Sequence, residues 1–212
     1  MKTDDLIRAL AADREPTGPA PGTALALAGA LGFVLSMLLF MWLVPLRPNL
    51  GEAMRSWPFM MKPIEMGILV VVSAVVVLRL AKPGAPLGRT LVAAAAVPAI
   101  MVAAVAVELM QVPRAEWLVK LAGVHWYMCV LNMVLLSLPI LGALLFGLRF
   151  GAPTRPTLAG VGAGLLSGAL AASLYIAHCP DDSPLFVAAW FTLAIAIATG
   201  IGALAGGRLL RW

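Results

Sequence analysis

The sequence predicts an all-α integral membrane protein, a bundle of six transmembrane helices preceded by a short amphipathic helix. The chain of 212 residues is 62% hydrophobic and 12% charged, and its mean hydropathy is +0.98. A soluble domain of this size cannot cover so much apolar surface. Six apolar stretches occur, each close to the ~20 residues that cross ~30 Å of hydrocarbon. These runs do not alternate in hydrophobicity, so they predict helices rather than barrel strands.

The predicted spans are joined by short connections, the longest of which is residues 45–62. They cover residues 23–44, 63–80, 91–109, 122–148, 158–177 and 186–205. The first is too long for a signal-peptide core and follows a mixed-charge segment, so we expect it to be retained. Pro98 and Pro139 predict kinks in the third and fourth spans. Glycines spaced four residues apart in the last two spans (160, 164 and 168; 202 and 206) predict close packing within the chain, or alternatively a dimer interface.

The distribution of basic residues predicts that both termini lie in the cytoplasm. Of the 15 Lys and Arg residues, ten lie in or beside the N-terminal segment, the connections after the second and fourth spans, and the C-terminal end. Cytoplasmic loops carry such an excess. On this topology six of the ten acidic residues lie on the outer side. The other four, all in the N-terminal segment, are then the only acidic residues on the cytoplasmic side.

The N-terminal segment, residues 1–22, predicts a small helix that binds a partner. Thr3 can cap the helix, and Asp4 and Asp5 in its first turn suit the positive end of the helix dipole. Three apolar residues form one stripe: Leu6, Ile7 and Leu10. Such a short helix is marginal in water and would be stabilised by docking its stripe into a groove.

A Pro- and Gly-rich linker, residues 16–22, separates this helix from the first span. We therefore divide the chain into a cytoplasmic partner-binding tail with its linker, 1–22, and a transmembrane bundle, 23–212. Helices that lie on membranes favour Lys and Arg, whereas this tail has four acids and three bases. We expect a basic soluble partner; the alternative is that the acids merely cap a helix resting on the bilayer. Nothing in the sequence indicates direct nucleic-acid binding.

The two cysteines and two histidines of the chain fall in two pairs. His125 and Cys129 lie one turn apart in the fourth span, and His178 and Cys179 are adjacent at the end of the fifth. The predicted topology places both pairs on the outer side. There the thiols could form a disulfide, or together with the two imidazoles bind a soft or borderline metal ion such as zinc, cadmium or copper. The alternative is that both cysteines are small packing residues.

The two thiols are expected at different depths. Cys129 would lie about seven residues into its helix, ~10 Å below the interface at ~1.5 Å per residue, and about one to two turns deeper than Cys179. A disulfide requires Cα atoms within about 7 Å. We therefore expect its formation to need a helix shift or an inward dip of the loop at Pro180.

Conventional catalytic motifs are absent from the sequence, and no permanent cofactor is expected. No predicted span carries an ionisable residue at mid-depth, and Glu65 and Glu108 fall near outer span ends, where a carboxylate can stay wet. Two other classes remain open. One is a membrane thiol–disulfide exchange enzyme that uses Cys129 and Cys179, and the other is a small-solute transporter, which the scarcity of polar groups along the spans disfavours.

Three segments resemble the negative-regulator-of-sigma-F (NrsF) family of six-span bacterial inner-membrane anti-sigma factors. They are residues 1–13 (MKTDDLIRALAAD), 178–186 (HCPDDSPLF) and 207–212 (GRLLRW). The resemblance implies that the tail sequesters an extracytoplasmic-function sigma factor. It also implies that two cysteines, here Cys129 and Cys179, serve in sensing oxidant or heavy-metal stress. The chain would then be a regulator and not an enzyme.

Overall fold

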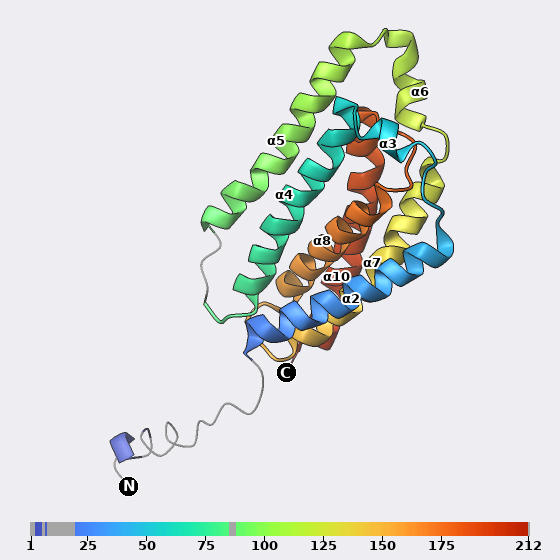
Figure 1. Ribbon diagram of the computed structural model, residues 1–212. Helices are drawn as coiled ribbons and strands as arrows, with labels where there is room; N and C mark the ends of the chain where they lie inside the picture. The colour runs from blue at the N-terminus through green and yellow to red at the C-terminus, as the bar shows by residue number, and fades with distance from the viewer. Residues whose placement is uncertain (1–2, 6, 8–19, 85–87, 212) are drawn as a thin grey trace.

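The computed structural model describes residues 3–5, 7, 20–84 and 88–211, which form helices and connecting turns without strands (Figure 1). Six helices are long and apolar enough to cross a membrane, which confirms the predicted all-α bundle. The long helices are α2 (Pro21–Leu43), α4 (Trp57–Leu80), α5 (Gly88–Gln111), α7 (Trp126–Leu148), α8 (Pro156–Tyr175) and α10 (Thr192–Leu209). The short elements are α3 (Leu50–Ala53), α6 (Trp117–Ala122), α9 (Pro184–Phe186), a 3₁₀ turn (Arg114–Glu116) and a π turn (Val187–Phe191).

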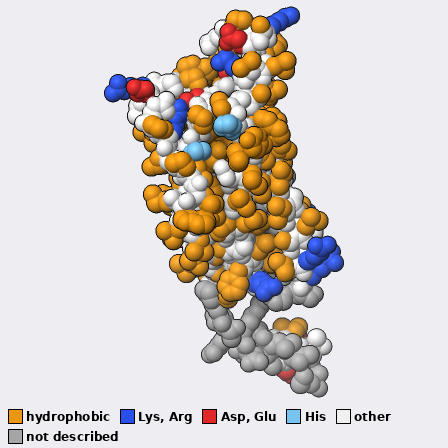
Figure 2. Space-filling model, turned by 90° about the vertical axis from the view of Figure 1, so that its right-hand side faces the viewer, with side chains coloured by type: hydrophobic (Ala, Val, Ile, Leu, Met, Phe, Trp, Pro, Cys, Tyr) orange, Lys and Arg blue, Asp and Glu red, His pale blue; other side chains and the backbone are white. Residues whose placement is uncertain are grey.

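The bundle has two polar ends and an apolar flank. Helix α2 begins and α10 ends at the same end of the bundle, which we call the terminal end (Figure 1). The opposite end, called the distal end, carries α3, α6 and α9 with their connections, residues 44–56, 112–125 and 176–186. Figure 2 shows hydrophobic side chains covering the flank, with Lys, Arg, Asp and Glu gathered near the two ends. This pattern matches a hydrocarbon layer bounded by two aqueous phases.

Helix α8 lies at the centre of the bundle, and its small residues bring the neighbouring backbones into contact. Ala163, Ala169 and Ala171 on this helix are fully buried. A Cβ added at Gly164 would lie 2.6 Å from the carbonyl oxygen of Ala198 in α10, and one added at Gly206 would lie 2.6 Å from the Cα of Gly160. The glycine spacing thus serves α8–α10 packing inside one chain, where close approach replaces the missing hydrophobic drive between helices.

The fourth predicted span, 122–148, is not one continuous helix. Helix α6 ends at Ala122, the chain turns at Gly123 with φ +58°, and α7 begins three residues later. A positive φ favours glycine because a Cβ would be strained there. The break starts α7 at Trp126, four residues later than expected, and this changes the depth of everything near its first turn.

Candidate functional site

A pocket of about 480 Å³ opens at the distal end, between the segment after α2, the first turn of α7 and the turn after α8. We call it the distal pocket. Every cysteine and histidine of the chain lines it: His125, Cys129, His178 and Cys179. Figure 2 shows both histidine side chains on one face near this end. The two Cys/His pairs, which lie about 50 residues apart in the sequence, therefore meet at one site.

The two thiols lie together in the wall of the distal pocket and in one buried cluster. Cys129 and Cys179 are unbridged and are 2% and 1% exposed. The Cys129 thiol donates to the Met133 Sδ at 3.8 Å, and the Cys179 thiol donates to the carbonyl oxygen of Asp181 at 3.6 Å. Interaction with the neighbouring Cys129 thiol holds the pKa of Cys179 below its usual range, and the nearby Lys62 ammonium acts in the same direction against the effect of burial. The pair is arranged for chemistry in which the two sulfurs react together.

The expected difference in depth between the thiols is not found. Because α7 begins at Trp126, Cys129 lies in its first turn, where its backbone N–H bonds to the carbonyl oxygen of His125 at 3.2 Å. The chain after α8 turns inward, so that Cys179 is buried beside it. The structure therefore contains the inward turn of this connection, which was one of the two routes to a disulfide expected from the sequence, the other being a helix shift. The break at Gly123, which a single apolar run in the sequence does not reveal, is what places Cys129 in the first turn of α7.

The histidines line the pocket but do not form a metal centre with the thiols. Within the described residues, no group of three or more His, Cys, Asp and Glu side chains is placed to hold a metal ion. His178 uses Nδ1 to donate to the carbonyl oxygen of Pro45 at 2.6 Å, and its ring packs against Tyr175 at 5.3 Å. The ring of His125 lies edge-on to Tyr127 at 6.3 Å. The four-residue ligand set expected from the sequence is thus not assembled, because local partners orient the imidazoles.

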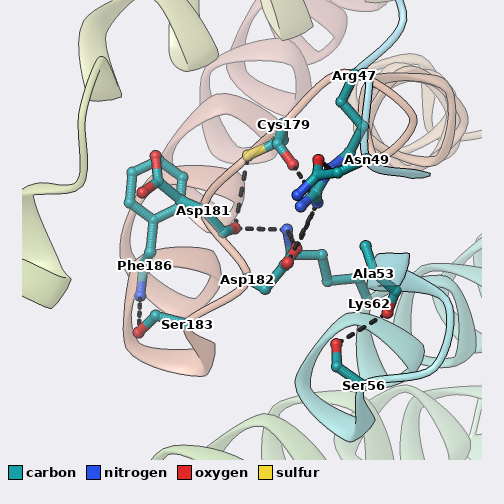
Figure 3. A network of polar contacts seen from close by, with 10 residues as sticks. All are labelled: Arg47, Asn49, Ala53, Ser56, Lys62, Cys179, Asp181, Asp182, Ser183 and Phe186. Carbon is teal, nitrogen blue, oxygen red and sulfur yellow. Dashed lines mark hydrogen bonds and ion pairs between the residues drawn. The ribbon is translucent and has the colours of Figure 1, made fainter. Parts of the chain in front are cut away.

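Two buried cations hold the turn that carries Cys179 (Figure 3). The guanidinium of Arg47 donates to the Cys179 carbonyl oxygen at 3.0 Å and to the Asp182 carboxylate at 2.9 Å. The Lys62 ammonium donates to the same carboxylate at 2.8 Å and to the Asp181 carbonyl oxygen. The side chains of Arg47 and Lys62 are only 6% and 1% exposed. Their burial is tolerated because each is hydrogen-bonded and shares a counter-charge.

A second anchor holds the far side of the same turn. The carboxylate of Glu108 in α5 accepts from the Ser183 hydroxyl at 2.8 Å and from the backbone N–H of Leu185 at 2.9 Å. Lys120 lies 3.8 Å from this carboxylate. The expectation that Glu65 and Glu108 stay wet is wrong, because they are 2% and 6% exposed. Glu108 is compensated by its donors, whereas Oε1 of Glu65 has no hydrogen-bond partner.

Arg47, Lys62 and Asp182 were not predicted as parts of the site. In the sequence the first two count only among the basic residues that set the topology, and the third only among the outer acids. A signal was available: the connection between the fifth and sixth spans contains two acids and no base. Those acids need counter-charges from elsewhere in the chain if the connection folds inward. Local sequence does not identify the cations that supply these charges, because Asp182 lies 135 residues from Arg47 and 120 from Lys62.

The predicted partner-binding residues are described only in part. Residues 3–5 and 7 are helical, and the side chains of Asp4, Asp5 and Ile7 are exposed. Leu6 and Leu10 lie outside the described residues. The exposed fraction of Ile7 is 58%. The amphipathic helix is therefore observed at its acidic start, and the function of its apolar stripe remains a prediction.

The fold and the pocket together define a polytopic helical membrane protein with a paired dithiol at one end of its bundle. Residues 10–212 match the family described as "Negative regulator of sigma F", NrsF. The chain is 40% identical to the anti-sigma-F factor NrsF of Caulobacter vibrioides (strain NA1000 / CB15N) and 37% identical to the probable anti-sigma-F factor NrsF of Azospira oryzae, in each case over the whole of both chains. No solved structure matches it. The chain belongs to the NrsF family.

Membership of this family makes the chain a negative regulator of a sigma factor. The family is one of anti-sigma factors and not of enzymes, so the thiol–disulfide exchange enzyme and the solute transporter are set aside. The resemblance seen in three short segments thus extends over nearly the full chain.

Proposed function

We propose that the chain is a bacterial inner-membrane anti-sigma factor that holds an extracytoplasmic-function sigma factor through its N-terminal helix. In this proposal both termini are cytoplasmic, residues 1–22 form the docking tail and its linker, and residues 23–212 form the sensing bundle. Release of the sigma factor follows oxidation of Cys129 and Cys179, or capture of a soft metal ion by the two thiols. The inner-membrane location and this orientation agree with the bias of Lys and Arg toward the terminal end.

The observation that carries the proposal is that the only two thiols of the chain lie together in the wall of a pocket open to the distal side. Two cysteines used only for packing have no need to lie together, and neither would have to lie on a cavity wall. A thiol with a lowered pKa, supported by a second thiol, is the arrangement expected of a redox-sensitive pair. The pair is placed at the end of the bundle that the proposed topology exposes to the oxidising compartment.

The redox step balances with a two-electron oxidant such as a hydroperoxide. The Cys179 thiolate attacks the peroxide, the O–O bond breaks, and an alkoxide or hydroxide leaves as the sulfur becomes a sulfenic acid. The Cys129 sulfur then attacks that sulfur, and water leaves as the S–S bond forms. In the net reaction each cysteine loses one hydrogen atom and one peroxide is reduced. The diazene reagent diamide achieves the same change by accepting the two hydrogens on its N=N bond.

The docking half of the proposal is supported by the chemistry of the tail. Asp4 and Asp5 are exposed at the start of a helix whose Ile7 is also exposed. An amphipathic helix with acidic and apolar groups in one turn fits a groove that combines a basic rim with an apolar floor. The other members of the predicted stripe, Leu6 and Leu10, would complete this apolar contact.

The docking test uses full-length protein in membranes and the cognate sigma factor. Two double variants should abolish sigma capture. Asp4→Lys with Asp5→Lys reverses the charge that a basic partner recognises. Leu6→Asp with Leu10→Asp places carboxylates in an apolar groove, at a cost of about 1–3 kcal/mol each. Membrane insertion should be unchanged, since the bundle does not use these residues. Glu52→Lys is the matched control, because Glu52 is an exposed acid at the distal end. Full capture by both double variants would exclude the tail as the docking element.

The sensing test uses the same preparation with diamide and, separately, cadmium. Cys129→Ser and Cys179→Ser should each bind the sigma factor as the parent does but retain it after treatment. Ser137→Ala, a buried residue of α7 away from the pocket, is the matched control. A double Ser variant that releases the sigma factor like the parent would show that the cysteines are packing residues.

A further inference from the structure

The segment that follows α2 is fastened to the segment that carries Cys179. The backbone N–H of Arg47 donates to the carbonyl oxygen of Ala177 at 3.1 Å, and Nδ1 of His178 donates to the carbonyl oxygen of Pro45 at 2.6 Å. The Arg47 guanidinium adds its bond to the carbonyl oxygen of Cys179. We call this joint between residues 45–47 and 177–179 the strap. A chain segment held through Pro45 and Arg47 to three successive residues, 177–179, must move with its partner.

The strap is a buried joint, which distinguishes it from a surface ion pair. Arg47 is 8% exposed, and its guanidinium is also bonded to Asp182 and to the side chain of Asn49 at 3.0 Å. Exposed ion pairs contribute little and exchange their partners readily. A guanidinium with several fixed acceptors in a dry site keeps one geometry, because breaking any of its bonds leaves a buried group unpaired.

Helix α2 also packs closely against α7, the helix that carries Cys129. The Ser36 hydroxyl donates to the carbonyl oxygen of Leu136 at 2.7 Å, and both residues are fully buried. A Cβ added at Gly32 would lie 2.8 Å from the Cα of Ile140. At the terminal end, Leu25 of α2 is buried with Val77 of α4 in one apolar cluster. Helix α2 therefore runs from the strap to the end of the bundle where the N-terminal tail begins.

We propose that Arg47 is a positioning residue that couples Cys179 to α2, so that joining the two thiols displaces α2 relative to α7. This inference rests on the proposed function. Cys129 is fixed in a helical turn, whereas Cys179 lies in a connection between helices. When the sulfurs close to the S–S length of about 2.05 Å, the connection moves toward α7. The Cys179 carbonyl carries Arg47 with it, and Arg47 carries the end of α2.

The structure supplies a reason why this motion reaches the tail. Helix α2 is the element directly joined to residues 1–20, and it packs at the terminal end on a separate apolar cluster from that of the thiols. A shift at its distal end must be accommodated along a helix whose contacts with α7 are too close to absorb it locally.

The experiment separates thiol oxidation from sigma release. Full-length protein in lipid nanodiscs is loaded with its sigma factor and treated with diamide. The disulfide is quantified by a maleimide mass shift, and the retained sigma factor is measured on the same sample. The Arg47→Ala variant should form the disulfide to the parental extent but release at least tenfold less sigma factor. Arg47→Lys, which keeps the charge, should restore part of the release.

Arg55→Ala is the matched control, because Arg55 is an exposed arginine of the same connection and lies outside the strap. His178→Ala opens the other side of the strap without leaving a buried charge, and it should also oxidise normally and release less. If Arg47→Ala fails to insert into the membrane, His178→Ala still tests whether the strap couples oxidation to release. Parental release from oxidised strap variants would overturn the role of Arg47 while leaving the proposed function intact. Retention of the sigma factor by the oxidised parent would instead overturn the proposed function.

Discussion

The carboxylate of Asp182 is the shared counter-charge of two buried cations. Arg47 reaches it at 2.9 Å and Lys62 at 2.8 Å, while the Asp182 side chain is itself 22% exposed. Two cations at one carboxylate leave a local excess of positive charge. The nearby carbonyl oxygens of Cys179 and Asp181 offset part of it by accepting hydrogen bonds. This residue therefore determines whether the turn beside the thiols can remain folded inward.

Asp182→Asn should destabilise the protein by about 3 kcal/mol, because removing one partner leaves buried charges uncompensated. The loss lies at the lower end of the usual range since Asp182 is partly exposed. Thermal unfolding of the full-length protein in detergent micelles measures it. Glu52→Gln, a change at an exposed acid of the same end, should leave the unfolding temperature unchanged. Equal unfolding temperatures for Asp182→Asn and the parent would show that Arg47 and Lys62 do not depend on this carboxylate.

The closeness of the two thiols predicts a pH dependence. Because interaction with the Cys129 thiol lowers the pKa of Cys179, Cys179 should be alkylated at lower pH than an ordinary thiol, whose pKa is about 8.5. Cys129→Ala removes this interaction, so the pKa of Cys179 should rise and the midpoint of its pH–rate profile should move upward. Iodoacetamide labelling followed by peptide mass spectrometry measures that midpoint. A wider opening in the variant would raise the maximal rate but not the midpoint, and an unchanged midpoint would contradict the prediction.

At the scale of elements, the break between α6 and α7 brings the two cysteines to one level. The break depends on Gly123, whose φ is +58° and whose missing side chain makes room for Phe186 and Asp181. The π turn that precedes α10 packs against the residues on both sides of this break. There the π turn presents Trp190, which donates to the carbonyl oxygen of Leu121 at 2.6 Å and stacks on Trp126 at 4.3 Å.

Gly123→Ala should therefore lower stability by more than about 1 kcal/mol, since the positive φ and the crowded site both oppose a side chain. Its Cβ would lie 2.9 Å from a carboxylate oxygen of Asp181 and against the ring of Phe186. Displacing that turn should also slow disulfide formation by diamide. Gly142→Ala in α7 is the control, because a Cβ there meets nothing within 4 Å. Parental stability and oxidation rate in Gly123→Ala would refute the role given to this break.

At the scale of the whole molecule, the polar residues lie at two ends of the bundle. The distal end holds the thiols among buried polar contacts. The terminal end carries the chain ends, and in the proposed topology it faces the cytoplasm. A span of ~30 Å of hydrocarbon separates the two ends. In the proposed function, sensing and sigma binding would therefore communicate only through the helices.

The orientation is tested by cysteine accessibility in intact cells, in a background with both native cysteines replaced by Ser. Glu52→Cys at the distal end should react with a membrane-impermeant maleimide. Arg155→Cys, on the connection between α7 and α8, should react only after the cells are lysed. This outcome is expected because the basic excess retains the terminal end in the cytoplasm. The reverse labelling pattern would invert the topology and remove the thiols from the outer side.

The sequence by itself determined the class of fold. Six apolar runs of spanning length leave only helices as an option, because the backbone has no other way to satisfy its hydrogen bonds in lipid. The glycine spacing in the last two long helices also predicted their close packing. Three short segments, 1–13, 178–186 and 207–212, were enough to indicate the family, which the full-length relatives then established.

Only the tertiary structure decided how the site is assembled. The pattern of apolar residues gives the length of a span. It does not show that Gly123 breaks the helix, so that Cys129 lies in the first turn of α7 near the depth of Cys179. It also cannot identify which cations will neutralise an inward-folded acid, because burial forces that choice among residues more than 100 positions apart. Periodicity is a local property, whereas the pairing of buried charges and thiols depends on how the helices pack.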